Sequence, residues 1–234
     1  MSLDTRTIAR SGVSPISVYM RQVYQWMTAG LAVTAVVAYA FASSAGLQQS
    51  ILDNSIIMIG LIIAQFGLVI VLSAAVHKMS ATMATGFFLL YSVLTGAMLS
   101  SVFVVYPVAS IANAFLATAG TFLAMSVYGV VTKRDLTAFG SFLTMGLFGL
   151  IIAMLVNFFL KSSQMDFVIS CLGVLIFTGL TAYDTQKIRN FGEGAPLDDV
   201  TAMRRGAILG ALTLYLDFIN LFLMMLRFSS ASRD

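Results

Sequence analysis

Long runs of apolar residues, separated by short polar breaks, dominate the pattern along this chain. A membrane-spanning helix needs about 20 mostly apolar residues, and charges, prolines or polar clusters end such a run. Residues 56–63 and 146–156 lack the alternation of apolar and polar positions that marks the strands of a membrane barrel. The pattern therefore predicts an all-α membrane protein with a bundle of seven transmembrane helices. These helices are expected at residues 22–44, 54–76, 80–105, 109–131, 137–160, 167–187 and 206–227.

The ends of the chain are more polar than its middle. We expect an N-terminal segment over residues 1–21, a transmembrane domain over 22–228 and a C-terminal tail over 229–234. The first segment contains no apolar core ahead of a small-residue cleavage site, so it does not resemble a removable signal peptide.

Composition narrows the class further. Apolar residues make up 59% of the chain and charged residues only 10%, whereas soluble domains average about 25% charged. The chain contains one cysteine and one histidine, which excludes a disulfide scaffold and a Cys/His metal site. Its basic residues lie between apolar runs and form no cluster typical of nucleic-acid binding. The expected partner is the lipid bilayer, with no nucleic acid and no cofactor.

The distribution of lysine and arginine predicts the orientation, because these residues are retained on the cytoplasmic side. If the N-terminus is cytoplasmic, the predicted cytoplasmic segments hold ten of the 13 and the opposite side holds three. The three are Lys161, Arg227 and Arg233. We therefore expect a multi-pass protein with a cytoplasmic N-terminus.

Two aspartates lie within the predicted helices, Asp184 in the sixth and Asp217 in the middle of the seventh. A carboxylate inside a bilayer is costly, so a functional role is the default hypothesis. Asp217 shares a helical face with Gly210 and Thr213, and small or polar residues of this kind favour close helix contacts. Both acids are therefore expected to face the interior of the bundle.

If the two carboxyl groups meet, they do not both ionise readily and would share one proton. They meet only if the seventh helix begins above the membrane surface or the sixth lies deep. Tyr183, Tyr215 and Asn220 are candidate supporting residues, since the tyrosine hydroxyls are candidate hydrogen-bond partners of the carboxyl groups and Asn220 shares a face with Asp217. Because hard cations prefer carboxylate oxygens, the deprotonated pair is also a candidate Ca²⁺ site.

Two segments around these acids form recognisable motifs. The sixth run contains Gly-Leu-Thr-Ala-Tyr-Asp-Thr-Gln at 179–186, and the seventh contains Ala-Leu-Thr-Leu-Tyr-Leu-Asp-Phe-Ile-Asn-Leu-Phe at 211–222. Together they resemble the paired signatures of the Bax inhibitor-1 family, also called transmembrane Bax inhibitor motif proteins, and most closely its bacterial branch.

This resemblance implies six helices around a central seventh, and a calcium leak across the bacterial inner membrane that is controlled by pH. In that scheme Asp184 and Asp217 match the carboxyl pair whose protonation sets the open or closed state. Protons and Ca²⁺, as the transported ion, would be the ligands. Bacterial relatives carry an arginine near the cytoplasmic end of the second helix, where this sequence has His77 and Lys78.

Two alternatives stay open at this point. Intramembrane aspartyl proteases also place one Asp after a Tyr, as in Tyr183-Asp184, and a second on the next helix. Their second Asp follows a Gly-x-Gly pattern, whereas bulky residues at 214–216 would obstruct a substrate peptide here, so no enzyme activity is expected. The other alternative is a regulator of a membrane protease or stress complex that binds through the charged loop 187–205, although a solvated connecting loop is the better explanation of these charges.

Overall fold

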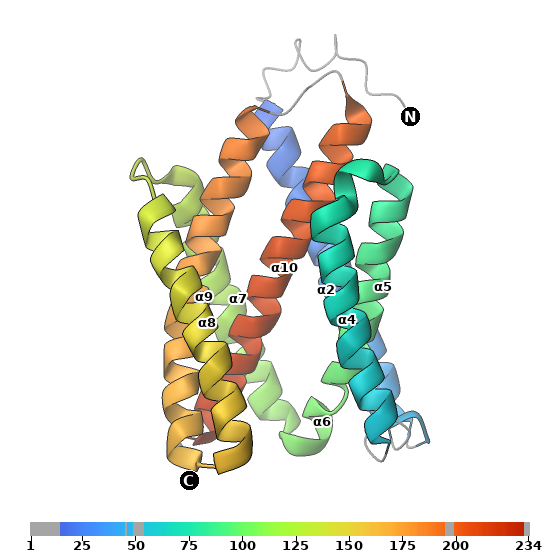
Figure 1. The fold of residues 1–234 in the computed structure, drawn as a ribbon, viewed down its shortest axis with the longest axis vertical. Helices are drawn as coiled ribbons and strands as arrows, with labels where there is room; N and C mark the ends of the chain where they lie inside the picture. The colour runs from blue at the N-terminus through green and yellow to red at the C-terminus, as the bar shows by residue number, and fades with distance from the viewer. Residues whose placement is uncertain (1–14, 45, 49–53, 195–198, 232–234) are drawn as a thin grey trace. The chain divides into compact units, whose positions relative to one another are not determined.

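A computed structural model describes residues 15–44, 46–48, 54–194 and 199–231 of the chain. Helices dominate these residues, and no strand occurs among them (Figure 1). Residues 1–14 of the predicted N-terminal segment and residues 232–234 of the predicted tail lie outside the described part. The elements are α2 (Pro15–Ser43), α4 (Ser55–Ala75), the 3-10 helix η1 (Val76–Lys78), α5 (Ala81–Leu99), α6 (Val102–Val105), α7 (Val108–Val131), α8 (Thr137–Leu160), α9 (Ser163–Glu193) and α10 (Val200–Ala231).

Seven helical spans in the described residues are long and apolar enough to cross a membrane, as predicted. The expected all-α, seven-helix architecture is therefore confirmed. The seventh span is also the most buried, with 67% of its apolar window covered against at most 44% in the other six. The last helix is thus the one that the protein covers most completely.

Three helices are longer than the apolar runs that predicted them. α2 begins at Pro15 rather than at 22, α9 continues to Glu193 rather than to 187, and α10 begins at Val200 rather than at 206. An apolar run marks only the part of a helix in contact with lipid, whereas the internal hydrogen bonds allow the helix to continue into water. The predicted boundaries after residues 21 and 228 consequently fall within α2 and α10.

The described residues group into two compact units. The first unit holds the residues up to Tyr106 together with Asn190–Leu212, and the second holds Pro107–Arg189 together with the residues from Thr213 onward. α10 is one continuous helix whose first part belongs to the first unit and whose second part belongs to the second.

In the first unit, α5 packs against α2 and against α4 (Figure 1). The hydroxyl of Thr34 on α2 donates a hydrogen bond to the Ser92 carbonyl of α5 at 2.9 Å. In the second unit, α8, α9 and the second part of α10 enclose a core of buried apolar residues. Its members are Leu143, Leu150, Ile169, Phe177, Leu180, Leu221 and Met224.

Close contact between α7 and α9 depends on Gly129. A Cβ atom at this position would overlap the backbone carbonyl oxygen of Ala182 and would lie 3.0 Å from the Cβ atom of Thr185. Backbone atoms cannot turn aside as a flexible side chain can. Gly129 thus brings the segment of α9 that carries Asp184 against α7.

We predict that Gly129→Ala destabilises the protein by about 1–3 kcal/mol, because overpacking a tight contact forces the backbones apart. Gly120→Ala is the matched control, since it lies on the same helix and has no neighbouring atom within 4 Å of its position for a Cβ. Thermal unfolding in detergent should show a lower midpoint for Gly129→Ala and an equal or higher midpoint for Gly120→Ala. Equal midpoints for the two variants would contradict the close packing of α7 on α9.

Candidate functional site

Asp184 and Asp217 meet in the second unit, where α9 supplies the first and α10 supplies the second. Their side chains are hydrogen-bonded to each other. α9 continues past Asp184 to Glu193, and α10 begins at Val200, earlier than its apolar run indicates. The condition for contact is therefore met, because the two side chains lie within reach of each other, and their role as a gating pair stays a prediction.

A hydrogen bond between two carboxyl groups requires a proton on one of them, since ionised carboxylates only accept. A hydrogen bond between Asp184 and Asp217 therefore needs one proton shared by the pair. Asp217 is only 6% exposed, and its Oδ2 atom is buried without a hydrogen-bond partner. Asp184 is half-buried. The arrangement combines a deeply placed acid that has one unused oxygen with a more accessible acid on the neighbouring helix.

Small residues and aromatic rings set the position of α10 around Asp217. A Cβ atom on Gly173 of α9 would lie 2.5 Å from the Met224 sulfur of α10, so these helices approach closely at that point. Phe218, the residue after Asp217, makes edge contacts with Phe115 and Phe122 of α7 at centroid distances of 5.7 and 5.4 Å. The backbone on one side of the carboxyl group is thus fixed by apolar packing.

Lys187 is the cation that acts on Asp184 most directly, and the sequence interpretation missed it. It follows Asp184 by three residues on α9, a spacing that places both side chains on one helical face, and it exerts an electrostatic attraction on the carboxylate. Its ammonium group also lies 5.9 Å from the centre of the Tyr183 ring. The spacing was visible in the sequence, but Lys187 stands at the end of its apolar run and was interpreted only as a cytoplasmic charge and as part of loop 187–205.

The other predicted supporting residues have separate roles. The Tyr183 ring packs on Gly140 of α8, where no Cβ atom would fit, and Tyr215 is fully buried. The Asn220 amide donates to the Leu216 carbonyl of its own helix at 2.9 Å. Neither Tyr183 nor Asn220 forms a hydrogen bond with the acids in the described structure, so the support expected from these two residues is not found.

His77 and Lys78 lie exposed in η1, which belongs to the first unit. The carbonyl oxygens of His77 and Met79 accept hydrogen bonds from Arg205 Nη1 at 2.8 and 3.1 Å. The backbone of this turn therefore binds an arginine from the start of α10. A role for His77 or Lys78 as the basic partner of the acid pair stays a prediction.

Gln186 is a second residue that sequence reasoning did not single out. Its side chain accepts from the Leu136 backbone N–H at 2.9 Å and donates to the Arg134 carbonyl at 2.8 Å, which attaches the α7–α8 loop to α9. In that loop the Thr137 hydroxyl and backbone N–H donate to Asp135 and lower the pKa of this exposed carboxyl group. Gln186 closes the 179–186 motif, but nothing in that motif indicates that its side chain binds a loop fifty residues earlier in the chain.

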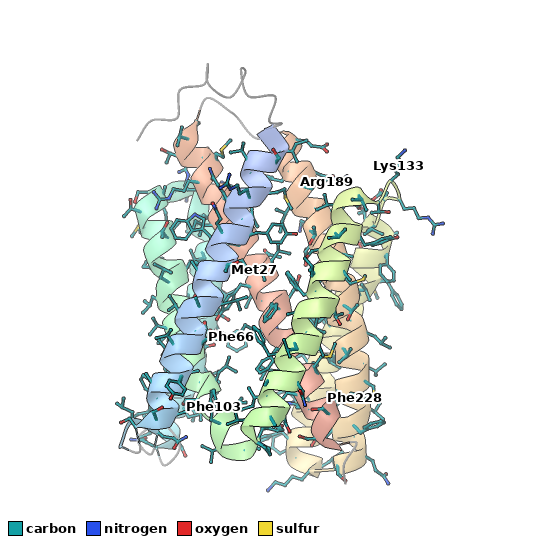
Figure 2. All side chains as sticks on the ribbon, turned by 180° about the vertical axis from the view of Figure 1, so that it is seen from behind. Met27, Phe66, Phe103, Lys133, Arg189 and Phe228 are labelled. Atoms are coloured by element: carbon teal, nitrogen blue, oxygen red, sulfur yellow. The ribbon has the colours of Figure 1, made fainter. Side chains whose placement is uncertain are left out.

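Arg189 adds another attachment, because its Nη1 atom donates to the Val130 carbonyl at the end of α7 at 2.6 Å. Figure 2 shows Arg189 and Lys133 at one end of the second unit and Phe228 at its other end. The segment of α9 around Asp184 is thus held to α7 and its loop by hydrogen bonds from Gln186 and Arg189.

Seven spanning helices, two of which bring together a pair of carboxyl groups, define a multi-pass membrane protein. The sequence matches the family model described as "Inhibitor of apoptosis-promoting Bax1" over residues 16–234. It is 56% identical over 212 residues to "Inner membrane protein YbhL" of Escherichia coli K12, which covers 91% of each chain. A protein of Borreliella burgdorferi is 50% identical over 92% of this chain and 93% of its own, and one of Deinococcus radiodurans is 43% identical over 94% and 92%. The chain belongs to the Bax inhibitor-1 family, which confirms the resemblance carried by its two motifs.

We predict that Gln186→Leu lowers the free energy of unfolding by about 1–3 kcal/mol, because it leaves one N–H and one carbonyl of the α7–α8 loop without their partner. Gln22→Leu is the control, since Gln22 is half-buried on α2 and makes no side-chain hydrogen bond in the described structure. The midpoint of thermal unfolding in detergent should fall for Gln186→Leu alone. An equal change in both variants would show that the loop attachment contributes nothing specific.

Proposed function

We propose that this chain is a pH-sensitive calcium leak channel of the bacterial inner membrane, gated by Asp184 and Asp217. The hydrogen bond between these two carboxyl groups, on neighbouring spanning helices, is the observation that carries the proposal. Membership of the family and the similarity to an inner membrane protein of Escherichia coli support the location. The activity involves no covalent reaction and no bound cofactor.

In this proposal, the proton shared by Asp184 and Asp217 keeps the channel closed. While one proton remains between the two groups, they attract each other and hold α9 and α10 together. When it leaves, two negative charges face each other at contact distance in a medium of low dielectric constant, and their repulsion favours separation of the helices. Because hydrogen bonds attach α9 to α7, separation moves α10 relative to α9.

Calcium is suited to such a site because it is a hard cation that binds oxygen ligands. The deprotonated pair offers carboxylate oxygens, including Asp217 Oδ2, which is not engaged in a hydrogen bond. A tight calcium site needs six to eight oxygen ligands, and no group of three or more His, Cys, Asp or Glu side chains gathers in the part of the chain that the structure describes. Weak binding by two carboxylates favours passage of the ion over its retention.

We predict that Ca²⁺ flux into dye-loaded proteoliposomes rises from pH 5 to pH 8 in the native protein, because deprotonation opens the pair. Asp184→Asn and Asp217→Asn should flatten this dependence, since an amide keeps the size of the side chain and does not titrate. Asp135→Asn is the matched control, because Asp135 is exposed in the α7–α8 loop, and it should keep the native profile.

Each other outcome has a defined meaning. A native flux that falls as the pH rises would overturn the assignment of the protonated pair to the closed state. Unchanged profiles in both Asn variants would remove the pair from the gate. A native protein that leaks no more than empty vesicles at any pH would refute the channel, and binding of a protein partner through loop 187–205 would then become the leading hypothesis.

The proposal also includes a cytoplasmic N-terminus, which the excess of Lys and Arg on that side supports. In a Cys171→Ala background, Lys133→Cys should react with a membrane-impermeant maleimide only from the cytoplasmic side, and Gln164→Cys only from the periplasmic side. Both positions are exposed; Lys133 lies in the loop before α8 and Gln164 in the first turn of α9, so α8 separates them. Labelling of Lys133→Cys in intact cells would reverse the orientation.

A further inference from the structure

Arg204 in the first unit is a half-buried cation whose hydrogen-bonding capacity is mostly unused. It lies one turn from the start of α10. Its Nη2 atom donates to the Thr85 hydroxyl of α5 at 3.3 Å, while its Nε atom is buried and has no hydrogen-bond partner. No carboxylate of the described residues pairs with it. A guanidinium withdrawn from water in this way is costly unless an anion accompanies it.

Aromatic and hydroxyl groups from two other helices surround this guanidinium. The Arg204 guanidinium carbon lies 5.4 Å from the centre of the Trp26 ring of α2, a cation–π distance. Thr85 is buried and already donates its own hydrogen to the Ala81 carbonyl at 2.8 Å, so toward Arg204 it acts only as an acceptor. Three helices of one unit thus hold the guanidinium in place without neutralising its charge.

Further positive charge lies next to Arg204. Arg205 is bound to the carbonyls of His77 and Met79, which places it beside the exposed Lys78. Both Arg204 and Thr85 lie within the first two turns of their helices, where a spanning helix passes through the headgroup region. Tryptophan is enriched at the same depth of membrane proteins. The anion available at that depth is the phosphate of a lipid headgroup.

We propose that Arg204, Trp26 and Thr85 form a binding site for the phosphate group of an anionic phospholipid. The planar guanidinium of Arg204 donates to two phosphate oxygens, a geometry that suits arginine better than lysine. Trp26 packs on the guanidinium and on the lipid backbone, and Arg205 and Lys78 attract the net negative charge of the headgroup. The site concerns the first unit and does not depend on the gating of the acid pair.

Trp26 makes this proposal directly testable, because it is the single tryptophan of the chain. Its fluorescence therefore reports from the site itself. The full-length protein is reconstituted into phosphatidylcholine vesicles that contain equal fractions of either brominated phosphatidylglycerol or brominated phosphatidylcholine. The ratio of the quenching constants gives the preference for the anionic lipid at Trp26.

In the native protein we expect a preference of about fivefold for phosphatidylglycerol, the order of magnitude for one well-placed cation at a membrane surface. Arg204→Gln should reduce the ratio to about one. Lys133→Gln removes the same charge from an exposed position of the second unit and should leave the ratio unchanged. Helical circular dichroism and gel filtration establish that each variant is folded.

Arg204→Lys keeps the positive charge but loses the paired N–H donors of the guanidinium and the Nε donor. The ratio of the quenching constants should therefore fall about twofold. This variant replaces Arg204→Gln if the latter does not fold. Equal quenching by the two brominated lipids in the native protein, or an unchanged ratio in both Arg204 variants, would overturn the proposal. Inorganic phosphate at about 10 mM should not alter the quenching. If phosphate alone abolishes the preference, the site binds a soluble anion and its assignment to a lipid is wrong.

Discussion

The hydrogen bond between Asp184 and Asp217 is the interaction on which the rest of the second unit depends. Inside a bilayer no water compensates a carboxyl group, so each acid must find its partner within the protein or remain unsatisfied at high cost. That requirement brings α9 and α10 to within hydrogen-bonding distance. Farther along the same two helices, the Met224 side chain occupies the space that a Cβ atom at Gly173 would fill.

The two helices that carry the acids are held by different forces. α9 is fixed by directional hydrogen bonds, from Gln186 to the α7–α8 loop and from Arg189 to the end of α7. α10 is held near Asp217 by contacts between apolar groups, chiefly Phe218 against Phe115 and Phe122. Apolar contacts tolerate small displacements, whereas hydrogen bonds lose strength steeply with angle and distance. Of the two helices that carry the acids, α9 is therefore held rigidly and α10 can shift slightly.

The sequence was sufficient for the number of spanning helices and for the two acids, because both depend on local composition. Apolar runs and an aspartate inside a run are visible without any knowledge of packing. Helix ends were predicted less well, since α9 and α10 continue into polar residues whose helical state no apolar pattern marks. The division into two units and the binding of Gln186 to a distant loop depend on how the helices pack. Packing results from many residues acting together, so no single position in the sequence reveals it. Arg205 illustrates the same limit, because its partners are backbone carbonyls and carry no side-chain signature.

The attachment made by Gln186 also has a consequence for the order in which the molecule is assembled. Membrane helices insert first and associate afterwards, and the α7–α8 hairpin enters the bilayer before α9 has been synthesised. Until then, the Leu136 N–H and the Arg134 carbonyl can bind only water at the membrane surface. The arrival of α9 replaces that water with one side chain and closes the loop. The hairpin is therefore an incomplete intermediate during biogenesis, and the helix that carries Asp184 is also the one that completes it.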